Sequence, residues 1–405
     1  MRSACLGMVI RLGPGAADCC MNTIFKRLRA QFLTQTAERV APLDLEIILL
    51  THILPDRPEF LSAIRRIAPI KSVIAVPYST HHETLSKLRT EFEVITPDLA
   101  TLRRSDYLIG LVRAARGTAP TAIMEIGGYF APVLQDLRTE FAQDFLGVVE
   151  DTEIGHRRYQ EAQPLPCPVV SVARSTLKAA EDSLVGPSCV YSIERLIREA
   201  GFPLAPCTSL VLGYGRVGRG VAAASRSRGW RTVVYDVDPT RRLLALSEGF
   251  AVPQRSSALA NAHLILGATG SRAISRHDYR CIKRGAILAS CSSQDIEFDV
   301  AYLKTSCRVE PVVDGIRAYH RGDSVLYLLG EGRPVNFLHG AVIGPILTLV
   351  QAEILLALRQ LWNVRALPGM HEVPPGEQLQ LVSEWMTTFC DQDSGSYRLC
   401  EKQDE

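Results

Sequence analysis

The sequence predicts an α/β protein with two domains on parallel sheets, the second a Rossmann domain inserted in a substrate-binding domain. Two observations carry this prediction. Short apolar runs alternate with amphipathic segments in the first half, and a glycine-rich turn at 213–218 joins an apolar run to a helical pattern. With 405 residues, 47% of them hydrophobic, the chain is long enough for two domains that each bury a core.

The first half of the chain is expected to form the first sheet. Its apolar runs have βαβ spacing and lie at Leu45–Leu50, Ser72–Val76, Glu93–Ile95, Thr121–Ile126 and Phe145–Val149, with a further strand at Val169–Val172. A helix through Lys178 and Asp182 should follow, and Gly186-Pro187 is expected to end it as a hinge.

The glycine-rich turn is the clearest chemical signal in the chain. Gly213 permits a tight turn, Gly215 lets the backbone approach a pyrophosphate, and Gly218 lets the helix pack closely on the strand. The helix begins near Arg216 and Val217, so its first N–H groups should face the phosphates of a dinucleotide.

Asp236 follows the next apolar run, about 20 residues beyond the glycines, as dinucleotide sites require. Its carboxylate can accept hydrogen bonds from both hydroxyls of an adenosine ribose and would repel a 2′-phosphate, which favours NAD over NADP. Arg231, Arg241 and Arg242 lie close enough in sequence to keep NADP open. A purely structural turn is the other alternative, and the complete series of strand, turn, helix, strand and acid argues against it.

The remaining segments continue the alternation. Helices are expected at Val190–Ala200, from Asp238-Pro239 to Gly249, and from Gly344 to Leu361, and strands at His263–Leu266, Ala286–Ala289 and Val309–Val313. The expected division is a substrate-binding domain at 1–187, a Rossmann domain at 188–345, and C-terminal helices at 346–405 that return to the first domain and end in a tail.

Composition narrows the class of protein. The formal net charge of +2 and the lack of a long basic run argue against a nucleic-acid or membrane surface. The apolar stretch Cys5–Ile10 is too short for a signal peptide or a membrane span, so a cytoplasmic protein is expected. The 11 cysteines lack paired spacing, and neither a disulfide framework nor a metal site is expected.

Several segments together resemble the S-adenosylhomocysteine hydrolase family. They are Gly213–Gly220, Asp236–Pro239, Ala268–Gly270, Asp295–Asp299 and Glu331–Asn336, and the resemblance runs from about Leu43 to Pro374. It implies a tightly held NAD that oxidises the ribose 3′-hydroxyl of a small-molecule nucleoside, followed by elimination and hydration at the 5′ position. It also implies a homodimer or homotetramer.

The resemblance implies that Lys178 and Asp182 are catalytic and serve the oxidation of the hydroxyl. Their i, i+4 spacing places both on one helical face, where the carboxylate can orient the amine and a positive nicotinamide can lower the pKa of the lysine. A surface salt bridge is the alternative. Ser183 stands where the family has an asparagine.

Other site residues are carried over from the family in the same way. His52 would move a proton at the 5′ side, although a histidine that caps a strand end is an equal alternative. Asp56 would hold the adenine or a hydroxyl, Asp151 would bind the ribose, and Thr152, Thr269 and Asn336 would contact the cofactor. For these residues a purely structural role in a loop is the alternative.

Four departures from the family bear on the reaction. Ile126 stands where a catalytic aspartate is expected, Ser293 replaces a histidine, Ile343 lies at the place of another histidine while His339 is displaced, and the tail from Thr387 lacks the lysine and tyrosine ending. The sequence thus supports transient oxidation by bound NAD more strongly than hydrolysis of the thioether. A non-catalytic NAD-binding regulator or oligomer partner, and a simple dehydrogenase that releases NADH, are the alternatives.

Overall fold

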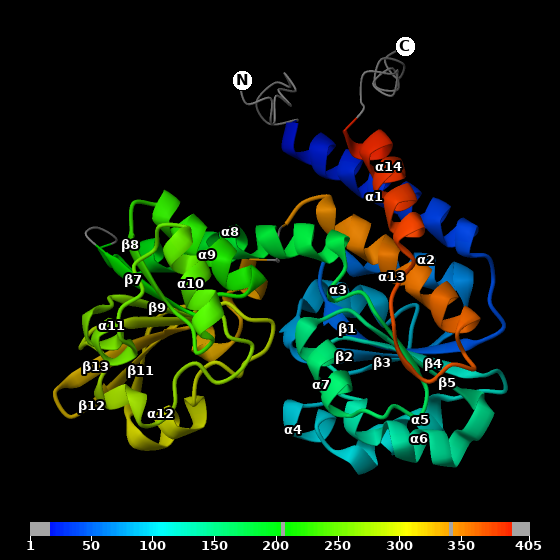
Figure 1. The fold of residues 1–405 in the computed structure, drawn as a ribbon, viewed down its shortest axis with the longest axis horizontal. Helices are drawn as coiled ribbons and strands as arrows, with labels where there is room; N and C mark the ends of the chain where they lie inside the picture. Colours follow the sequence, from blue (N-terminus) through cyan, green and yellow to red (C-terminus); the bar gives the residue numbers. More distant parts are fainter. Residues whose placement is uncertain (1–16, 204–206, 340–342, 391–405) are drawn as a thin grey trace.

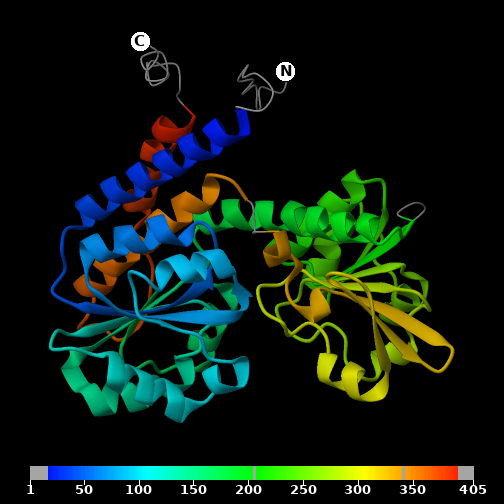
Figure 2. The ribbon, with the colours of Figure 1, turned by 180° about the vertical axis from the view of Figure 1, so that it is seen from behind.

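The computed structural model describes residues 17–203, 207–339 and 343–390. The stretch Cys5–Ile10 and the tail beyond residue 390 lie outside this range. The chain forms two α/β units joined side by side by the long helix α8, and α1 and α14 lie together above the first unit (Figures 1 and 2). The predicted α/β class with a Rossmann-type second unit is confirmed.

The first sheet has seven parallel strands in the order β14-β6-β5-β4-β1-β2-β3. The strands are β1 (Glu46–Ile53), β2 (Ile70–Thr80), β3 (Val94–Ile95), β4 (Thr121–Glu125), β5 (Phe145–Glu150), β6 (Pro168–Ser171) and β14 (Gly369–His371). The order reverses direction between β1 and β4, which creates a crevice at their carboxyl ends, where doubly wound sheets bind ligands. The returning C-terminal segment supplies the edge strand β14.

Helices cover both faces of this sheet. One face carries α1 (Ala17–Val40), α2 (Arg57–Ile67), α3 (His82–Leu88), α13 (Ile346–Asn363) and α14 (Pro375–Phe389), and the other carries α4 (Leu99–Leu102), α5 (Ser105–Ala115), α6 (Leu134–Phe141) and α7 (Glu153–Glu161). Helix α13 is buried along most of its length, as expected of a helix that is apolar on all sides.

The second sheet has the order β11-β12-β13-β10-β9-β7-β8. Its strands are β7 (Thr208–Leu212), β8 (Arg231–Tyr235), β9 (Leu264–Gly267), β10 (Ile287–Ser290), β11 (Arg308–Val313), β12 (Ile316–Arg321) and β13 (Ser324–Leu329), and its helices are α9 (Arg216–Ser227), α10 (Pro239–Ser247), α11 (Arg255–Asn261) and α12 (Val300–Ser306). Here the crevice lies between β7 and β9.

The second sheet is not parallel throughout. Strand β12 runs antiparallel to both β11 and β13, so the sheet is parallel from β13 to β8 and antiparallel at this edge. Gly322 and Asp323 form the two-residue connection between β12 and β13, and Gly322 has a φ of +55°. A Gly-Asp pair between two apolar runs is a hairpin signal, so the sequence did contain this information.

Helix α8 (Thr176–Glu199) runs unbroken from one unit to the other, and the predicted hinge at Gly186-Pro187 is therefore wrong. A Cβ atom on Gly186 would lie 2.2 Å from the carbonyl carbon of Gly220 on α9. The glycine is needed because the two helix backbones cross closely there.

Among the described residues, no helix combines the length and the apolar character needed to span a membrane.

Candidate functional site

The glycine turn has the geometry that a dinucleotide phosphate requires. Gly213 has a φ of +94°, and a Cβ atom there would lie 2.5 Å from the Ala268 carbonyl oxygen across the β7/β9 crevice. A Cβ atom on Gly218 would lie 2.1 Å from the Gly213 carbonyl oxygen. At Gly215 the space is open, with only the Arg241 guanidinium at 3.7 Å.

Helix α9 begins directly after this turn, at Arg216 and Val217. Its N-cap is Gly215, and no side chain accepts a hydrogen bond from the N–H groups of the first turn. Unpaired N–H groups at a helix N-terminus, next to open space, suit an anionic phosphate. The residues present therefore fit the pyrophosphate of NAD.

Asp236 lies at the end of β8 and is only 5% exposed. Its carboxylate accepts hydrogen bonds from the backbone N–H of Tyr214 at 2.6 Å and of Asp238 at 2.9 Å, which fixes it beside the glycine turn. Among the three arginines noted in the sequence, Arg241 is the one that approaches this acid, with Nη1 3.7 Å from Oδ2. The guanidinium of Arg242 lies instead over the Tyr235 ring.

Thr269 follows β9 and is held by the buried Glu297. The carboxylate of Glu297 accepts hydrogen bonds from the Thr269 N–H (2.8 Å), the Thr269 hydroxyl (2.7 Å) and the Gly270 N–H (2.8 Å). Burial raises the pKa of Glu297 to about 7 although these bonds favour its charged form. Glu297 thus positions the loop that faces the glycine turn, a role that the sequence did not suggest.

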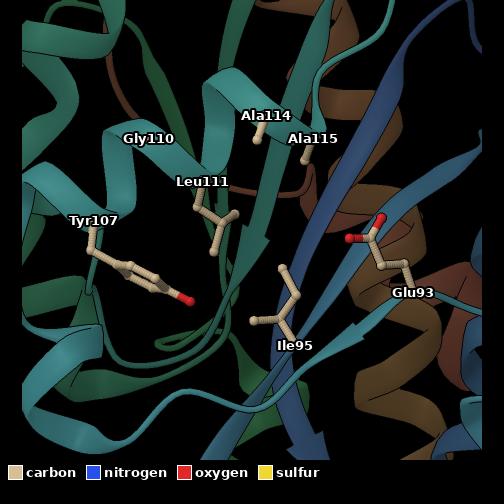
Figure 3. A pocket seen from close by; sticks show the side chains of 7 residues that line it. All are labelled: Glu93, Ile95, Tyr107, Gly110, Leu111, Ala114 and Ala115. Carbon is tan, nitrogen blue, oxygen red and sulfur yellow. The ribbon is translucent and has the colours of Figure 1, made fainter.

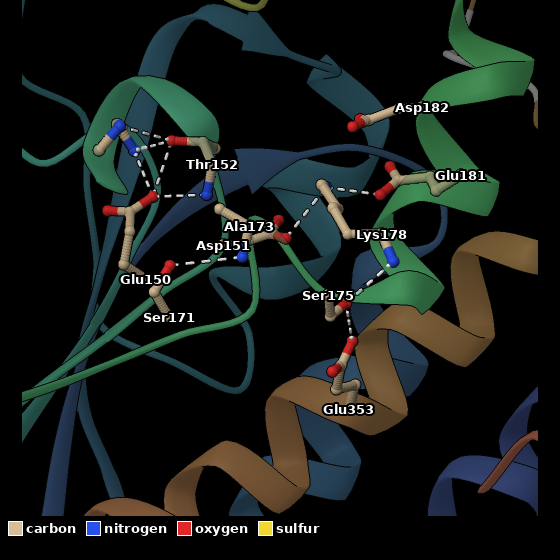
Figure 4. A network of polar contacts seen from close by, with 12 residues as sticks. Glu150, Asp151, Thr152, Ser171, Ala173, Ser175, Lys178, Glu181, Asp182 and Glu353 are labelled. Atoms are coloured by element: carbon tan, nitrogen blue, oxygen red, sulfur yellow. Dashed lines mark hydrogen bonds and ion pairs between the residues drawn. The ribbon is translucent and has the colours of Figure 1, made fainter. Parts of the chain in front are cut away.

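Lys178 lies in a cluster of carboxylates at the start of α8 (Figure 4). Its Nζ atom is 3.0 Å from Asp151 Oδ1 and 2.5 Å from Glu181 Oε2, and its side chain is 11% exposed. Glu181 was not among the predicted residues. Burial lowers the pKa of the lysine, but the charges of Asp151, Glu181 and Asp182 outweigh it and raise the pKa above its usual value. The lowering of this pKa that is expected from a positive nicotinamide would act against these carboxylates.

Asp182 does not form the predicted ion pair with Lys178. Its Oδ2 atom lies 3.4 Å from Nη1 of Arg216, the first residue of α9. Arg216 also donates hydrogen bonds to the carbonyl oxygens of Ala173 (3.0 Å) and Arg174 (3.3 Å), just before α8. The glycine-turn helix is therefore tied directly to the segment that carries Lys178.

Thr152 caps helix α7 rather than pointing into open space. Its hydroxyl accepts hydrogen bonds from Gly155 N–H (3.1 Å) and Gly127 N–H (2.8 Å) and donates one to the buried Glu150 (2.7 Å). Glu150 also accepts bonds from the N–H groups of Gly127 and Gly128. These bonds fix the loop after β4 and leave Ile126, an apolar residue, at the crevice of the first sheet.

His52 lies at the end of β1 and is enclosed by aromatic and polar groups. Its Nδ1 atom is hydrogen-bonded to the Ser79 hydroxyl, and its ring centroid is 4.6 Å from that of Phe337, which comes from the second unit. Burial, then the charges of Arg57 and Lys178, lower the pKa of His52 well below its usual value. Its imidazole is therefore neutral at neutral pH.

Asp56 is buried at the start of α2 and pairs with two groups. It accepts a hydrogen bond from Gln351 on α13 and lies 3.5 Å from the guanidinium of Arg57. Asn336 is also buried, in the loop after β13, and its Oδ1 atom has no hydrogen-bond partner. An unpaired buried carbonyl of this kind is free to accept a bond from a ligand.

The displaced histidine is not part of the lysine cluster. His339 lies against Tyr191 on the second half of α8, with ring centroids 6.1 Å apart. Ile343, at the place of the family histidine, is buried. No group of three or more His, Cys, Asp or Glu side chains suited to a metal ion occurs within residues 17–203, 207–339 and 343–390.

Two cavities lie in the first unit. A small one of about 20 Å³ opens at the β1/β4 crevice and is bordered by Thr51, Ile126 and Asp151, among others. A larger one of about 330 Å³ lies at the sheet edge between β3 and α5, lined by Ile95, Tyr107, Gly110 and Leu111 (Figure 3). The larger cavity contains none of the predicted site residues.

Two doubly wound sheets, a glycine turn with space for a phosphate, and an acid fixed beside it define an NAD-binding protein of the Rossmann class. Residues 188–342 match the sequence model of the S-adenosyl-L-homocysteine hydrolase NAD binding domain. This part of the chain is therefore similar to the NAD-binding domain of the S-adenosyl-L-homocysteine hydrolases, which supports NAD as the cofactor, as the sequence predicts.

Curated relatives show the same sequence similarity. The S-inosyl-L-homocysteine hydrolase of Methanopyrus kandleri is 31% identical over 232 residues, which cover 55% of this chain and 54% of the relative. The adenosylhomocysteinase of Archaeoglobus fulgidus is 31% identical over 222 residues, covering 54% and 55%. The aligned part of this chain therefore spans about half the length of these relatives.

Solved structures that resemble this chain include a pyruvate reductase of Chlamydomonas reinhardtii, with 14% identity, a TM-score of 0.38, and coverage of 67% of this chain and 74% of that one. A glyoxylate reductase from Paecilomyes thermophila has 13% identity and a TM-score of 0.38, covering 80% and 96%.

Proposed function

We propose that this chain is an adenosylhomocysteinase-like enzyme that uses tightly bound NAD to oxidise the ribose 3′-hydroxyl of S-adenosylhomocysteine or a related nucleoside transiently. The observation that carries the proposal is the contact between Arg216, at the start of the glycine-turn helix, and Asp182, on the helix that bears Lys178. This contact makes the cofactor site and the amine neighbours. The proposal assigns 188–345 to the cofactor and 1–187 with 346–405 to the nucleoside.

Each charged group has a role in this proposal. Lys178 takes the proton of the sugar hydroxyl, and Asp151 and Glu181 hold its amine in place. The amine must first become neutral, and the Glu181 carboxylate at 2.5 Å, whose pKa is raised by burial, is the nearest acceptor for its proton. Bound NAD supplies the acceptor for the hydride of the sugar carbon.

The 5′ side of the proposed site favours oxidation over hydrolysis. A leaving thiolate needs an acid, whereas Ile126 is apolar and the neutral imidazole of His52 is packed against Phe337. We therefore expect thioether cleavage to be slow or absent.

The test uses purified full-length protein reconstituted with NAD. Addition of S-adenosylhomocysteine, S-inosylhomocysteine or adenosine should produce NADH-like absorbance, while release of free homocysteine or nucleoside should stay low. No absorbance change with any of the three, in protein shown to contain NAD, would refute the proposal. Cofactor that exchanges with solvent during turnover would indicate a simple dehydrogenase.

A non-catalytic NAD-binding protein is the second candidate, supported by the raised pKa of Lys178 and by the apolar Ile126. Replacing Lys178 by alanine should abolish cofactor reduction in an enzyme and should change no function of a scaffold. In either case we expect a homodimer or homotetramer, which sedimentation analysis would measure.

A further inference from the structure

The buried helix α13 carries a carboxylate at a position that is otherwise apolar. Glu353 lies between Ala352 and Ile354, in a helix whose buried residues are mainly leucine, isoleucine, valine and alanine, and it is fully buried. A buried carboxylate is costly unless hydrogen bonds compensate for the lost water. A purely structural helix would be better served by an apolar side chain here.

The partner of Glu353 is the residue that caps helix α8. Oε2 of Glu353 accepts a hydrogen bond of 2.7 Å from the Ser175 hydroxyl (Figure 4). The same hydroxyl accepts a 3.0 Å bond from the backbone N–H of Lys178, as an N-cap does. Because Ser175 donates in one direction and accepts in the other, its hydroxyl cannot rotate without breaking one of the bonds.

The second oxygen of Glu353 remains unsatisfied. Its Oε1 atom is buried and has no hydrogen-bond partner, and the charges of Lys178 and Asp151 act on this carboxyl group. To accept the hydrogen bond of the Ser175 hydroxyl, the side chain at position 353 would need only one oxygen atom. The arrangement instead connects α13 to the amine cluster on α8 through a single hydroxyl.

We propose that Glu353 is a positioning residue for Lys178 and acts through the Ser175 hydroxyl. The proposal rests on the role of Lys178 in the proposed function and adds to it a group on the returning C-terminal helix. Glu353 does not touch the proposed sugar site; it fixes the first turn of α8, from which the amine reaches Asp151.

Two substitutions at this position separate the hydrogen bond from the charge. Glu353→Gln keeps an oxygen that can accept the Ser175 bond at nearly equal volume. It also mimics the neutral acid, which is appropriate because burial raises the pKa of Glu353 to about 7. Glu353→Leu removes the acceptor. Leu356→Ala, at another fully buried position of α13, is the control for loss of stability in the same helix.

The kinetic readout is the single-turnover rate of bound-NAD reduction by the best nucleoside. Glu353→Leu should slow this rate by about tenfold or more with nucleoside affinity changed by less than about threefold, and Glu353→Gln should stay within about threefold of the wild type. Adding Ser175→Ala to Glu353→Leu should cause little further loss, because both act through one path. A rate unchanged by Glu353→Leu, or slowed no more than by Leu356→Ala, would overturn the proposal.

A second readout does not depend on activity. The chain has only seven lysines, so ε-carbon-labelled lysine gives a simple NMR spectrum in which Lys178→Arg identifies one signal. Glu353→Leu should displace the Lys178 signal and leave the others in place, and Glu353→Gln should restore it. An unmoved Lys178 signal in the folded Glu353→Leu protein refutes the positioning role. A moved signal in a protein that reduces no cofactor refutes only the proposed function.

Discussion

The amine of Lys178 lies 3.0 Å from the carboxylate of Asp151, which stands directly after strand β5, so a helix and a strand end of the first unit meet at this pair. Arg216 reaches the same helix from the second unit through Asp182. The lysine cluster thus lies where the two units touch, beside the cofactor turn.

Replacing Lys178 by alanine should lower the rate at which bound NAD is reduced by about 10²- to 10⁴-fold, since general-base catalysis contributes about that much to a rate. NAD content should not change, because Lys178 contacts none of the residues of the glycine turn. Stopped-flow absorbance and cofactor analysis after denaturation measure the two effects. Lys87→Ala, at an exposed position on α3, is the control and should behave as the wild type.

Gly213→Ala should abolish NAD binding, because a methyl group there would both strain a φ of +94° and meet the Ala268 carbonyl at 2.5 Å. Gly229→Ala is the matched control. Its φ is also positive, at +76°, but no atom lies within 4 Å of the added carbon, so it should cost only about 1–2 kcal/mol of backbone strain. Calorimetry with NAD distinguishes them; equal affinities would contradict the placement of the cofactor.

Asp236→Ala should weaken the binding of NAD by about tenfold or more and reduce the preference for NAD over NADP. The substitution removes the ribose acceptor and frees Arg241, now 3.7 Å from the acid, to meet a 2′-phosphate. Arg241→Ala in the same background should remove the gain in NADP binding. Titrations with both dinucleotides provide the measurement, and an unchanged ratio would exclude the assigned role of Asp236.

Stability should depend on pH through Glu297. Its pKa is raised to about 7 in the folded state by burial, so the folded protein binds more protons than the unfolded chain between the two pKa values. The contribution of this residue is therefore greatest at acidic pH and falls as pH rises from about 5 through about 7, by about 3 kcal/mol at most. The free energy of unfolding of Glu297→Gln, measured in urea, should lack this part of the pH dependence. If the variant and the wild type depend on pH in the same way, Glu297 does not have this effect.

Gly186→Ala should destabilise the protein, because the added carbon would lie 2.2 Å from the backbone of Gly220 where α8 and α9 cross. Gly110→Ala, inside α5 with no atom within 4 Å, should instead stabilise by about 0.5–1 kcal/mol. Thermal unfolding of both variants tests the crossing. Equal effects would favour the hinge that the sequence suggested.

The sequence predicted what local patterns encode. The turn from Gly213 to Gly218 and Asp236 were found because each requires a fixed residue type at a fixed spacing. The contact between Glu353 and Ser175 was missed for the opposite reason: the two residues lie 178 positions apart in the sequence, and only the fold brings them together. A single acid within the apolar run of α13 was the available signal.

Pro187 was interpreted as a helix breaker on local grounds. The packing of α8 against α9 outweighs this preference, and the helix continues. Glu181, by contrast, was overlooked because Asp182 beside it matched the family pattern. An i, i+3 spacing from Lys178 was equally compatible with an ion pair.

The return of α13 and β14 to the first sheet has a consequence for synthesis on the ribosome. The nascent first unit lacks helix α13 and strand β14 until residues 346–371 emerge from the ribosome. The second unit, by contrast, already has all seven strands of its own sheet at that point. We expect the nucleotide-binding half to fold first during translation and the N-terminal half to wait, with apolar surface open to chaperones in the interval.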